Sequence, residues 1–101
     1  MLLRITPTDA PRGFRVEGEL DLATAGELRG ALEAATAEGG ELALDLSGLT
    51  FIDSSGLRVL IQTAASLDGR GALVVLRPSS PVKRVFDIAI PGGFPGLDVR
   101  D

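Results

Sequence analysis

Hydrophobic and polar positions alternate along the first twenty residues in a way that predicts β-strands. Residues 13–20 show the alternation best, because Phe14 and Val16 flank the charged Arg15. A strand with this pattern belongs to a sheet that keeps one face in water. Residues 2–6 form an earlier apolar run, and the segment between the two runs contains turn-forming prolines and glycine. We therefore expect the chain to open with a hairpin of two strands.

Three later segments have apolar residues at the three- and four-residue spacing of an amphipathic helix. The first begins near Thr24, which forms the pattern of a capping box with Glu27, and it stops at the glycine pair 39–40. The second covers residues 54–68, and the third starts with Ser80 as N-cap and a proline at the first helical position. The expected core positions are Leu28, Ala31, Leu32 and Ala35 in the first helix, Leu57, Leu60, Ile61, Ala64 and Leu67 in the second, and Val82, Val85, Phe86 and Ala89 in the third, with Arg29 and Glu33 pointing away from the core.

Short apolar runs between these helices predict further strands. Residues 41–46 place leucine at every second position, and residues 72–76 form an unbroken apolar run typical of a strand buried on both faces. Residues 97–100 can add a short last strand, whereas residues 48–56 read as a loop. The order β-β-α-β-α-β-α, with a possible final β, predicts an α/β fold. We expect one domain over residues 1–101, with a mixed, mostly parallel sheet and an antiparallel N-terminal hairpin.

Composition and charge exclude several classes of function. The net charge of −4 and the scattered arginines argue against nucleic-acid binding. The chain has no cysteine and no histidine, so it contains no thiolate site and cannot form a Ser-His-Asp triad. We expect neither an enzyme nor a bound metal or cofactor. No apolar run approaches the ~18 residues that span a bilayer, and no signal peptide is evident, so we expect a cytoplasmic protein without membrane contact.

The candidate functional residues follow two strands of the predicted sheet. In parallel sheets, binding sites gather beyond the carboxyl ends of the strands. Asp21 follows one strand and the Asp53-Ser54 step follows another, so we expect both at the same end of the domain. Ser54 also opens a helix, where backbone N–H groups and the helix dipole favour an anion. Asp53 or Ser54 can equally serve as an ordinary helix cap, and the two interpretations are compatible.

Three stretches of the chain together resemble a known family. They are GELD at 18–21, followed by Thr24, then DLSGLTFIDSSGL at 45–57, and SPVKRVFD at 80–87. In this order they resemble the STAS-domain anti-sigma factor antagonists of bacteria. The resemblance covers most of the chain, from the second predicted strand to the third predicted helix, and it implies a STAS-like fold.

The resemblance implies a switch between protein partners. Ser54 aligns with the serine that a partner kinase, which is also the anti-sigma factor, phosphorylates. Unphosphorylated protein is then expected to bind the kinase and free the sigma factor, and a serine phosphatase to reverse the modification. The implied partner contacts are Asp21, Asp53, Ser54, Ser55 and Gly56. We expect a monomer or weak dimer, and a phosphate on Ser54 that adds charge to acidic surroundings near Asp53 and Asp21.

Two other functions stay open at this point. A STAS-type domain can be an adaptor subunit of a larger assembly, such as a lipid-transport ATPase or a stress-sensing complex, although Ser54 argues against this. A small phosphate- or nucleotide-binding domain is the other alternative, with the start of the second helix as its site. Asp21 likewise has two interpretations, as a partner contact or as a cap of the first helix.

Overall fold

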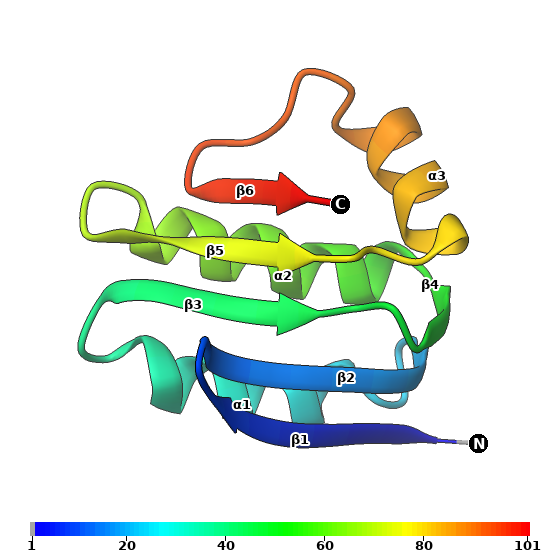
Figure 1. Cartoon of the computed structure of the whole chain (residues 1–101). Coiled ribbons are helices and arrows are strands. Elements are labelled where there is room, and N and C mark those ends of the chain that lie inside the picture. Colours follow the sequence, from blue (N-terminus) through cyan, green and yellow to red (C-terminus); the bar gives the residue numbers. More distant parts are fainter. Residues whose placement is uncertain (1) are drawn as a thin grey trace.

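Strands and helices follow each other in the predicted order, with one strand added. The structure, a computed structural model, describes residues 2–101. Figure 1 shows the arrangement of the elements. Their bounds are β1 Leu3–Asp9, β2 Arg12–Leu20, α1 Ala25–Thr36, β3 Gly40–Asp45, β4 Leu49–Ile52, α2 Ser54–Leu67, β5 Gly71–Leu76, α3 Ser80–Ala89 and β6 Leu97–Arg100.

The sheet is mixed and mostly parallel, as the sequence predicted. Its strand order is β1-β2-β3-β5-β6, and β4 pairs with β2 beside this path. The β1–β2 hairpin is antiparallel, while β3, β4, β5 and β6 pair in parallel with their neighbours. The arrows of β3, β5 and β6 accordingly point the same way in Figure 1. The α/β class and the N-terminal hairpin are confirmed.

The prediction of a loop over residues 48–56 is wrong, because part of this segment forms β4. Strand β3 pairs with β2 only in its first half, at residues 13–15. This leaves the second half of β2, up to Leu20, free to pair with β4. In β4 the two end residues are buried and the two middle ones exposed, so the strand lacks the alternation that signals a half-buried strand.

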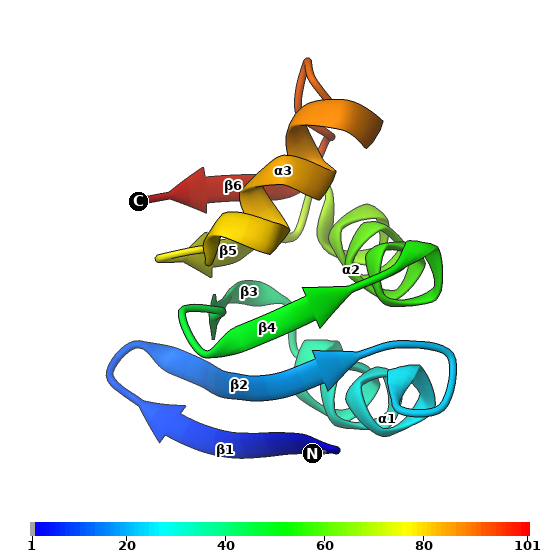
Figure 2. The same cartoon turned by 90° about the vertical axis from the view of Figure 1, so that its right-hand side faces the viewer.

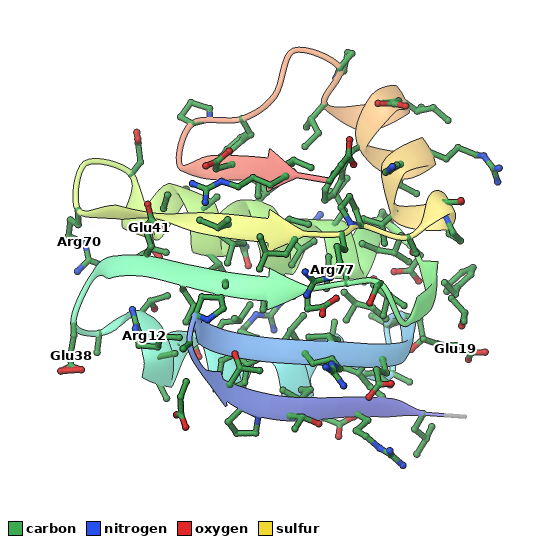
Figure 3. All side chains as sticks on the ribbon, in the orientation of Figure 1. Arg12, Glu19, Glu38, Glu41, Arg70 and Arg77 are labelled. Carbon is green, nitrogen blue, oxygen red and sulfur yellow. The ribbon has the colours of Figure 1, made fainter. Side chains whose placement is uncertain are left out.

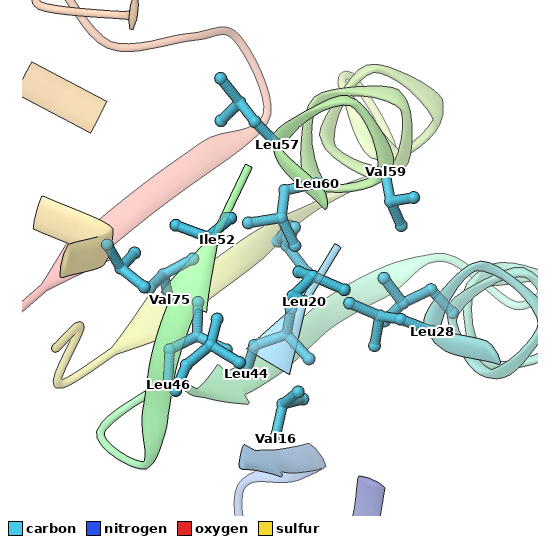
Figure 4. Close-up of a cluster of buried hydrophobic side chains, with 14 of the residues drawn as sticks. Val16, Leu20, Leu28, Leu44, Leu46, Ile52, Leu57, Val59, Leu60 and Val75 are labelled. Atoms are coloured by element: carbon cyan, nitrogen blue, oxygen red, sulfur yellow. The ribbon is translucent and has the colours of Figure 1, made fainter. Parts of the chain in front are cut away.

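Helices α1 and α2 lie side by side on one face of the sheet (Figure 2), and α3 packs against β4. Figure 4 shows the core between these layers, which is built from leucine, valine and isoleucine. Leu20, Leu28, Leu44 and Leu60 have no exposed surface. Burial of apolar surface stabilises such a core by ~25 cal/mol for each Å² removed from water, and this is the main stabilising contribution.

The predicted core stripes of the helices are confirmed with one exception. Val82 and Phe86 are buried and Val85 is partly buried, but Ala89 is exposed. The helix ends at Ala89, and the partly buried Ile90 packs against the core in its place. The predicted core positions of α3 are therefore confirmed for Val82, Val85 and Phe86 and wrong for Ala89.

One predicted helix cap has the right residue without the predicted side-chain bond, and another lies one residue away from its predicted position. At α1, Thr24 occupies the N-cap position without a side-chain capping bond, because its hydroxyl donates to the carbonyl of Glu19 at 2.8 Å. At α3 the N-cap residue is Ser79 and not Ser80, which is the first helical residue. The Ser79 hydroxyl donates to the carbonyl of Leu49, so it links α3 to β4.

Two arginines hold the end of the sheet opposite the candidate site. Figure 3 shows Arg12 and Arg70 at this end and Glu19 at the other. Arg12 donates to the carbonyls of Ala35 and Gly39, and Arg70 donates to carbonyls of α1 and α2. Cations at helix C-termini satisfy carbonyls that lack helical partners. These arginines are therefore explained by the fold.

Candidate functional site

The two predicted site loops meet at one edge of the sheet. Leu20 at the end of β2 pairs with Ile52 at the end of β4. The backbone N–H of Asp53 then donates to the carbonyl of Leu20 at 3.2 Å. Because β2 and β4 are parallel, Asp21 and Asp53 directly follow paired residues. The expectation that both lie at the same end of the domain is confirmed, with β4 as the second strand.

Asp53 caps α2 and leaves Ser54 free. Asp53 has extended backbone angles, and its Oδ1 accepts the N–H groups of Ser55 at 2.9 Å and Gly56 at 3.2 Å. The choice between Asp53 and Ser54 as the cap is thereby decided for Asp53. Ser54 is exposed, Ser55 is partly buried, and within residues 2–101 the Ser54 hydroxyl forms no hydrogen bond.

Gly56 lies beneath the surface, where it lets α2 approach β2. It is buried, and a Cβ at this position would lie 2.5 Å from Cγ of Leu20 and 3.0 Å from the Leu20 carbonyl oxygen. Real side chains essentially never come so close, so any larger residue would push the start of α2 outward. The structural role of Gly56 is to set the height of Ser54 above the sheet.

Asp21 organises the turn that leads into α1. Its Oδ1 accepts the N–H groups of Ala23 at 3.0 Å and Thr24 at 3.2 Å. The N–H of Asp21 in turn donates to the hydroxyl of Thr24, which is buried. The N-cap position of α1 is Thr24, so the Asp21 carboxylate holds the turn before the helix and does not cap the helix itself. Asp21 is partly exposed, and the hydrogen bonds to its carboxylate within residues 2–101 all go to Oδ1.

A cavity of about 370 Å³ opens beside Ser54, between the N-terminal halves of α1 and α2. Two basic side chains that sequence reasoning did not assign to the site, Arg29 and Arg58, line it together with Ser54 and Ser55. Neither arginine has an ion-pair partner within residues 2–101. The expected acidic surroundings of Ser54 are therefore wrong on the cavity side, and the Asp53 and Asp21 carboxylates are engaged by backbone N–H groups. Leu22, Ala25 and Gly26 complete the lining.

The sequence could have placed Arg58 at this site, because Arg58 follows Ser54 by four positions. Residues at this spacing share one face of a helix. Arg29 was expected to point away from the core, and it does, but its position across from Ser54 depends on how α1 packs beside α2. Helical periodicity fixes the face of each helix and leaves the pairing of two helices open.

A second polar cluster lies away from this site and is fully satisfied. Asp45, at the end of β3, accepts hydrogen bonds from Arg77 at 2.6 Å and from the N–H and hydroxyl of Ser47 at 3.0 and 2.8 Å. Burial alone raises the pKa of this carboxyl, but the bonds from Arg77 and Ser47 outweigh it and hold the pKa below its ordinary value. Arg77, labelled in Figure 3, has a φ of 47°. The cluster joins β3 to the end of β5.

Neither a metal site nor a membrane span stands out in the described part of the chain. Residues 2–101 contain no group of three or more potential metal-ligating side chains. None of their helices combines the length and apolar character needed to cross a bilayer.

Comparison with known proteins gives a family and a set of similar structures. A family model described as "Mlab, STAS domain" matches residues 4–90. An anti-sigma factor antagonist from Mycobacterium paratuberculosis is 28% identical, with a TM-score of 0.74 over 95% of this chain and 83% of that one. The anti-sigma factor antagonist SpoIIAA in its unphosphorylated form is 21% identical, with a TM-score of 0.69 over 98% and 87%. A Thermotoga maritima protein is 19% identical, with a TM-score of 0.71 over 98% and 86%. The last two likenesses establish the fold alone.

Proposed function

The chain belongs to the STAS domain family, and we propose that it is an anti-sigma factor antagonist controlled by phosphorylation of Ser54. Its unmodified form binds an anti-sigma factor that is also a serine kinase, and so frees the sigma factor. Phosphorylation switches this binding off, and a serine phosphatase restores it. The function is thus one of binding and not of catalysis, and it places the chain in the cytoplasm with these partners. The antagonist from Mycobacterium paratuberculosis, at 28% identity, supports the general role.

One observation carries the proposal: the Ser54 hydroxyl is exposed and unengaged although it stands at the start of a helix. A serine at the N-cap position commonly uses its hydroxyl to cap the helix, but Ser54 is the residue after the N-cap. Here Asp53 caps α2 through Ser55 and Gly56, so Ser54 is available to a kinase without any loss of helix capping. In the transfer, the Ser54 Oγ–P bond forms as the bond between the γ-phosphoryl group and ADP breaks. The hydroxyl proton leaves to a base on the kinase.

The surface around Ser54 combines polar groups with exposed apolar ones. Leu22, which follows Asp21 and lines the cavity with Ser54, is 80% exposed, and Phe51, in β4 two residues before Asp53, is 47% exposed. Apolar and aromatic side chains surrounded by polar groups are typical of the centre of a protein–protein interface. We propose that Asp21, Asp53, Ser54 and Ser55 contact the partner on this surface, with Gly56 fixing its shape from below.

A phosphate on Ser54 brings about −1.5 to −2 charges into such an interface. A clean switch between two states needs roughly 5.5 kcal/mol of differential affinity. Interaction with the helix dipole amounts to only ~0.3–1 kcal/mol at an exposed end. The greater part must therefore come from lost fit and charge repulsion against the partner.

Phosphorylation by a purified kinase tests the proposal. The anti-sigma factor kinases encoded in the same genome are incubated one by one with the chain and ATP, and the modified residue is mapped by mass spectrometry of peptides. We expect one kinase to modify Ser54, to leave Ser55 unmodified, and to fail on Ser54→Ala, with Ser55→Ala as the matched control. Modification of Ser55, or of neither serine by any kinase, would overturn the proposal.

The same experiment separates the alternatives. An adaptor subunit of a larger assembly would stay unphosphorylated and bind its assembly with Ser54→Ala and parent alike. A phosphate- or nucleotide-binding domain would show a rise in melting temperature with ATP in the absence of any kinase.

Two variants of Asp21 are needed to separate a contact with the partner from its structural role in the turn before α1. Asp21→Asn keeps an oxygen for the N–H groups of Ala23 and Thr24 and removes the charge, whereas Asp21→Ala removes both. If Asp21 contacts the partner through its charge, both variants lose affinity and only Asp21→Ala loses stability. An unchanged dissociation constant for Asp21→Asn would remove Asp21 from the interface.

A further inference from the structure

The cavity beside Ser54 presents two arginines to the serine that the proposed function assigns to phosphorylation. Arg29 comes from α1 and Arg58 from α2, and both line the same cavity as Ser54. Both arginines are exposed, and neither forms an ion pair with another residue of the range 2–101. The two arginines line the cavity beside the Ser54 hydroxyl without forming an ion pair in residues 2–101, so they have no evident role in stabilising the fold.

The spacing on α2 brings Arg58 within reach of a group on Ser54. Residues four apart on a helix are neighbours on its surface. Side chains on a helix also lean toward its N-terminus, so a long side chain at Arg58 covers the turn that begins at Ser54. Arg29 approaches from the other wall of the cavity. Gly26 on α1 also lines the cavity, and a Cβ there would meet no atom within 4 Å.

The start of α2 offers little else to a phosphate. A helix N-terminus ordinarily binds anions through its unpaired N–H groups. In this chain the N–H groups of Ser55 and Gly56 donate to the Asp53 carboxylate, and that of Leu57 donates to the Asp53 carbonyl. These donors are taken, and the Asp53 carboxylate adds a negative charge nearby. The arginines are therefore the groups in the cavity able to neutralise a phosphate.

We propose that Arg29 and Arg58 bind the phosphate of phosphorylated Ser54 inside this cavity. The inference rests on the proposed function and adds a mechanism to it. Arginine forms paired hydrogen bonds with phosphate oxygens, and a phosphoserine carries three acceptor oxygens. The modified chain then holds its own phosphate, fills the cavity, and withdraws both arginines from any partner that would use them.

Phosphoserine installed at position 54 during translation tests the inference without a kinase. The second pKa of the phosphate, ordinarily about 6, is followed by ³¹P NMR in the phosphorylated parent, Arg29→Gln, Arg58→Gln and the double variant. An exposed arginine on α3 serves as the matched control, Arg84→Gln. We expect the pKa to rise by about 0.2–0.7 on removal of each cavity arginine, the range that corresponds to a partly exposed ion pair, and to stay constant in the control.

A second arm asks whether the cavity binds free phosphate instead. Inorganic phosphate is titrated into the unmodified parent while the Arg29 and Arg58 Nε–H signals are followed by NMR. We expect no saturable change below millimolar concentrations. Saturable binding of free phosphate, together with a phosphoserine pKa that Arg29→Gln and Arg58→Gln leave unchanged, would overturn the inference.

The two failures can be told apart. A phosphoserine pKa that is insensitive to both arginines contradicts this inference even where a kinase modifies Ser54. Conversely, the arginines can bind an installed phosphate in a chain that no kinase modifies, which would contradict the proposed function alone.

Discussion

Gly56 and Leu20 touch so closely that their contact fixes the start of α2 on the sheet. A Cβ on Gly56 would lie 2.5 Å from Cγ of Leu20, a residue with no exposed surface and so no room to move away. The Leu20 carbonyl also accepts the N–H of Asp53. The position of Ser54 above the sheet therefore depends on this one contact between β2 and α2.

Replacing Gly56 should destabilise the fold. Overpacking a core typically costs ~1–3 kcal/mol, so we expect Gly56→Ala to lower the free energy of unfolding by about this amount in a urea titration. The matched control is Gly26→Ala on α1, where a Cβ would meet nothing within 4 Å. Because alanine favours a helix over glycine by ~0.8–1.0 kcal/mol, the control should gain stability. Equal stability of Gly56→Ala and the parent would contradict the close contact.

The division of roles between Asp53 and Ser54 predicts opposite outcomes for adjacent substitutions. Asp53→Ala removes the carboxylate that caps α2 and should cost ~0.5–2 kcal/mol of unfolding free energy. Ser54→Ala removes a hydroxyl that has no partner in residues 2–101 and should leave the melting temperature unchanged. Thermal melts of both variants check this. A clear loss of stability in Ser54→Ala would mean that the serine takes part in the cap.

Asp45 should make the stability of the protein depend on acidic pH. Its pKa in the folded state is held below the ordinary value of 3.8, against the effect of burial, by hydrogen bonds from Arg77 and Ser47. A group of this kind stabilises the fold fully above its unfolded pKa and loses that contribution as the pH falls through the folded pKa. The stability difference between the parent and Asp45→Asn should therefore be largest near neutral pH and shrink below about pH 4.

Chemical unfolding of both proteins between neutral and strongly acidic pH measures this difference. Arg77→Gln is the companion variant, because it removes the cation and should bring the Asp45 pKa closer to its ordinary value. A parent–variant difference that stays constant over the whole pH range would show that the ionised form of Asp45 has no special stability in the fold.

Phe86 should be a core residue of α3. It is 6% exposed, whereas Ile88 on the same helix is 77% exposed. A buried phenylalanine replaced by alanine typically costs ~3–5 kcal/mol, so Phe86→Ala should unfold at much lower urea concentration. Ile88→Ala should stay close to the parent. Equal urea midpoints for the two variants would show that α3 does not bury Phe86 against the core.

Much of this fold follows from local pattern. The spacing of Leu28 and Leu32 predicts the buried side of α1, and the unbroken apolar run at 72–76 predicts β5, which lies between β3 and β6 in the sheet. Parallel order then places Asp21 and Asp53 at one edge. These features are predictable because each depends on periodicity within one segment or on the handedness of a crossover.

The remainder depends on contacts between segments. Strand β4 exists because β3 leaves half of β2 unpaired, which no pattern within residues 49–52 reveals. The Thr24 hydroxyl prefers the carbonyl of Glu19 to a place in a capping box. Arg29 meets Ser54 only through the packing of α1 beside α2. In each case, tertiary contact overrides or completes a local preference.

Phosphorylation of Ser54 should switch partner binding off. Isothermal titration calorimetry of the unmodified and the Ser54-phosphorylated chain, each against the anti-sigma factor kinase that modifies it, measures this directly. We expect the phosphorylated form to bind about ten-thousandfold more weakly, which corresponds to the ~5.5 kcal/mol of differential affinity that a clean switch requires. Equal dissociation constants for the two forms would contradict the account.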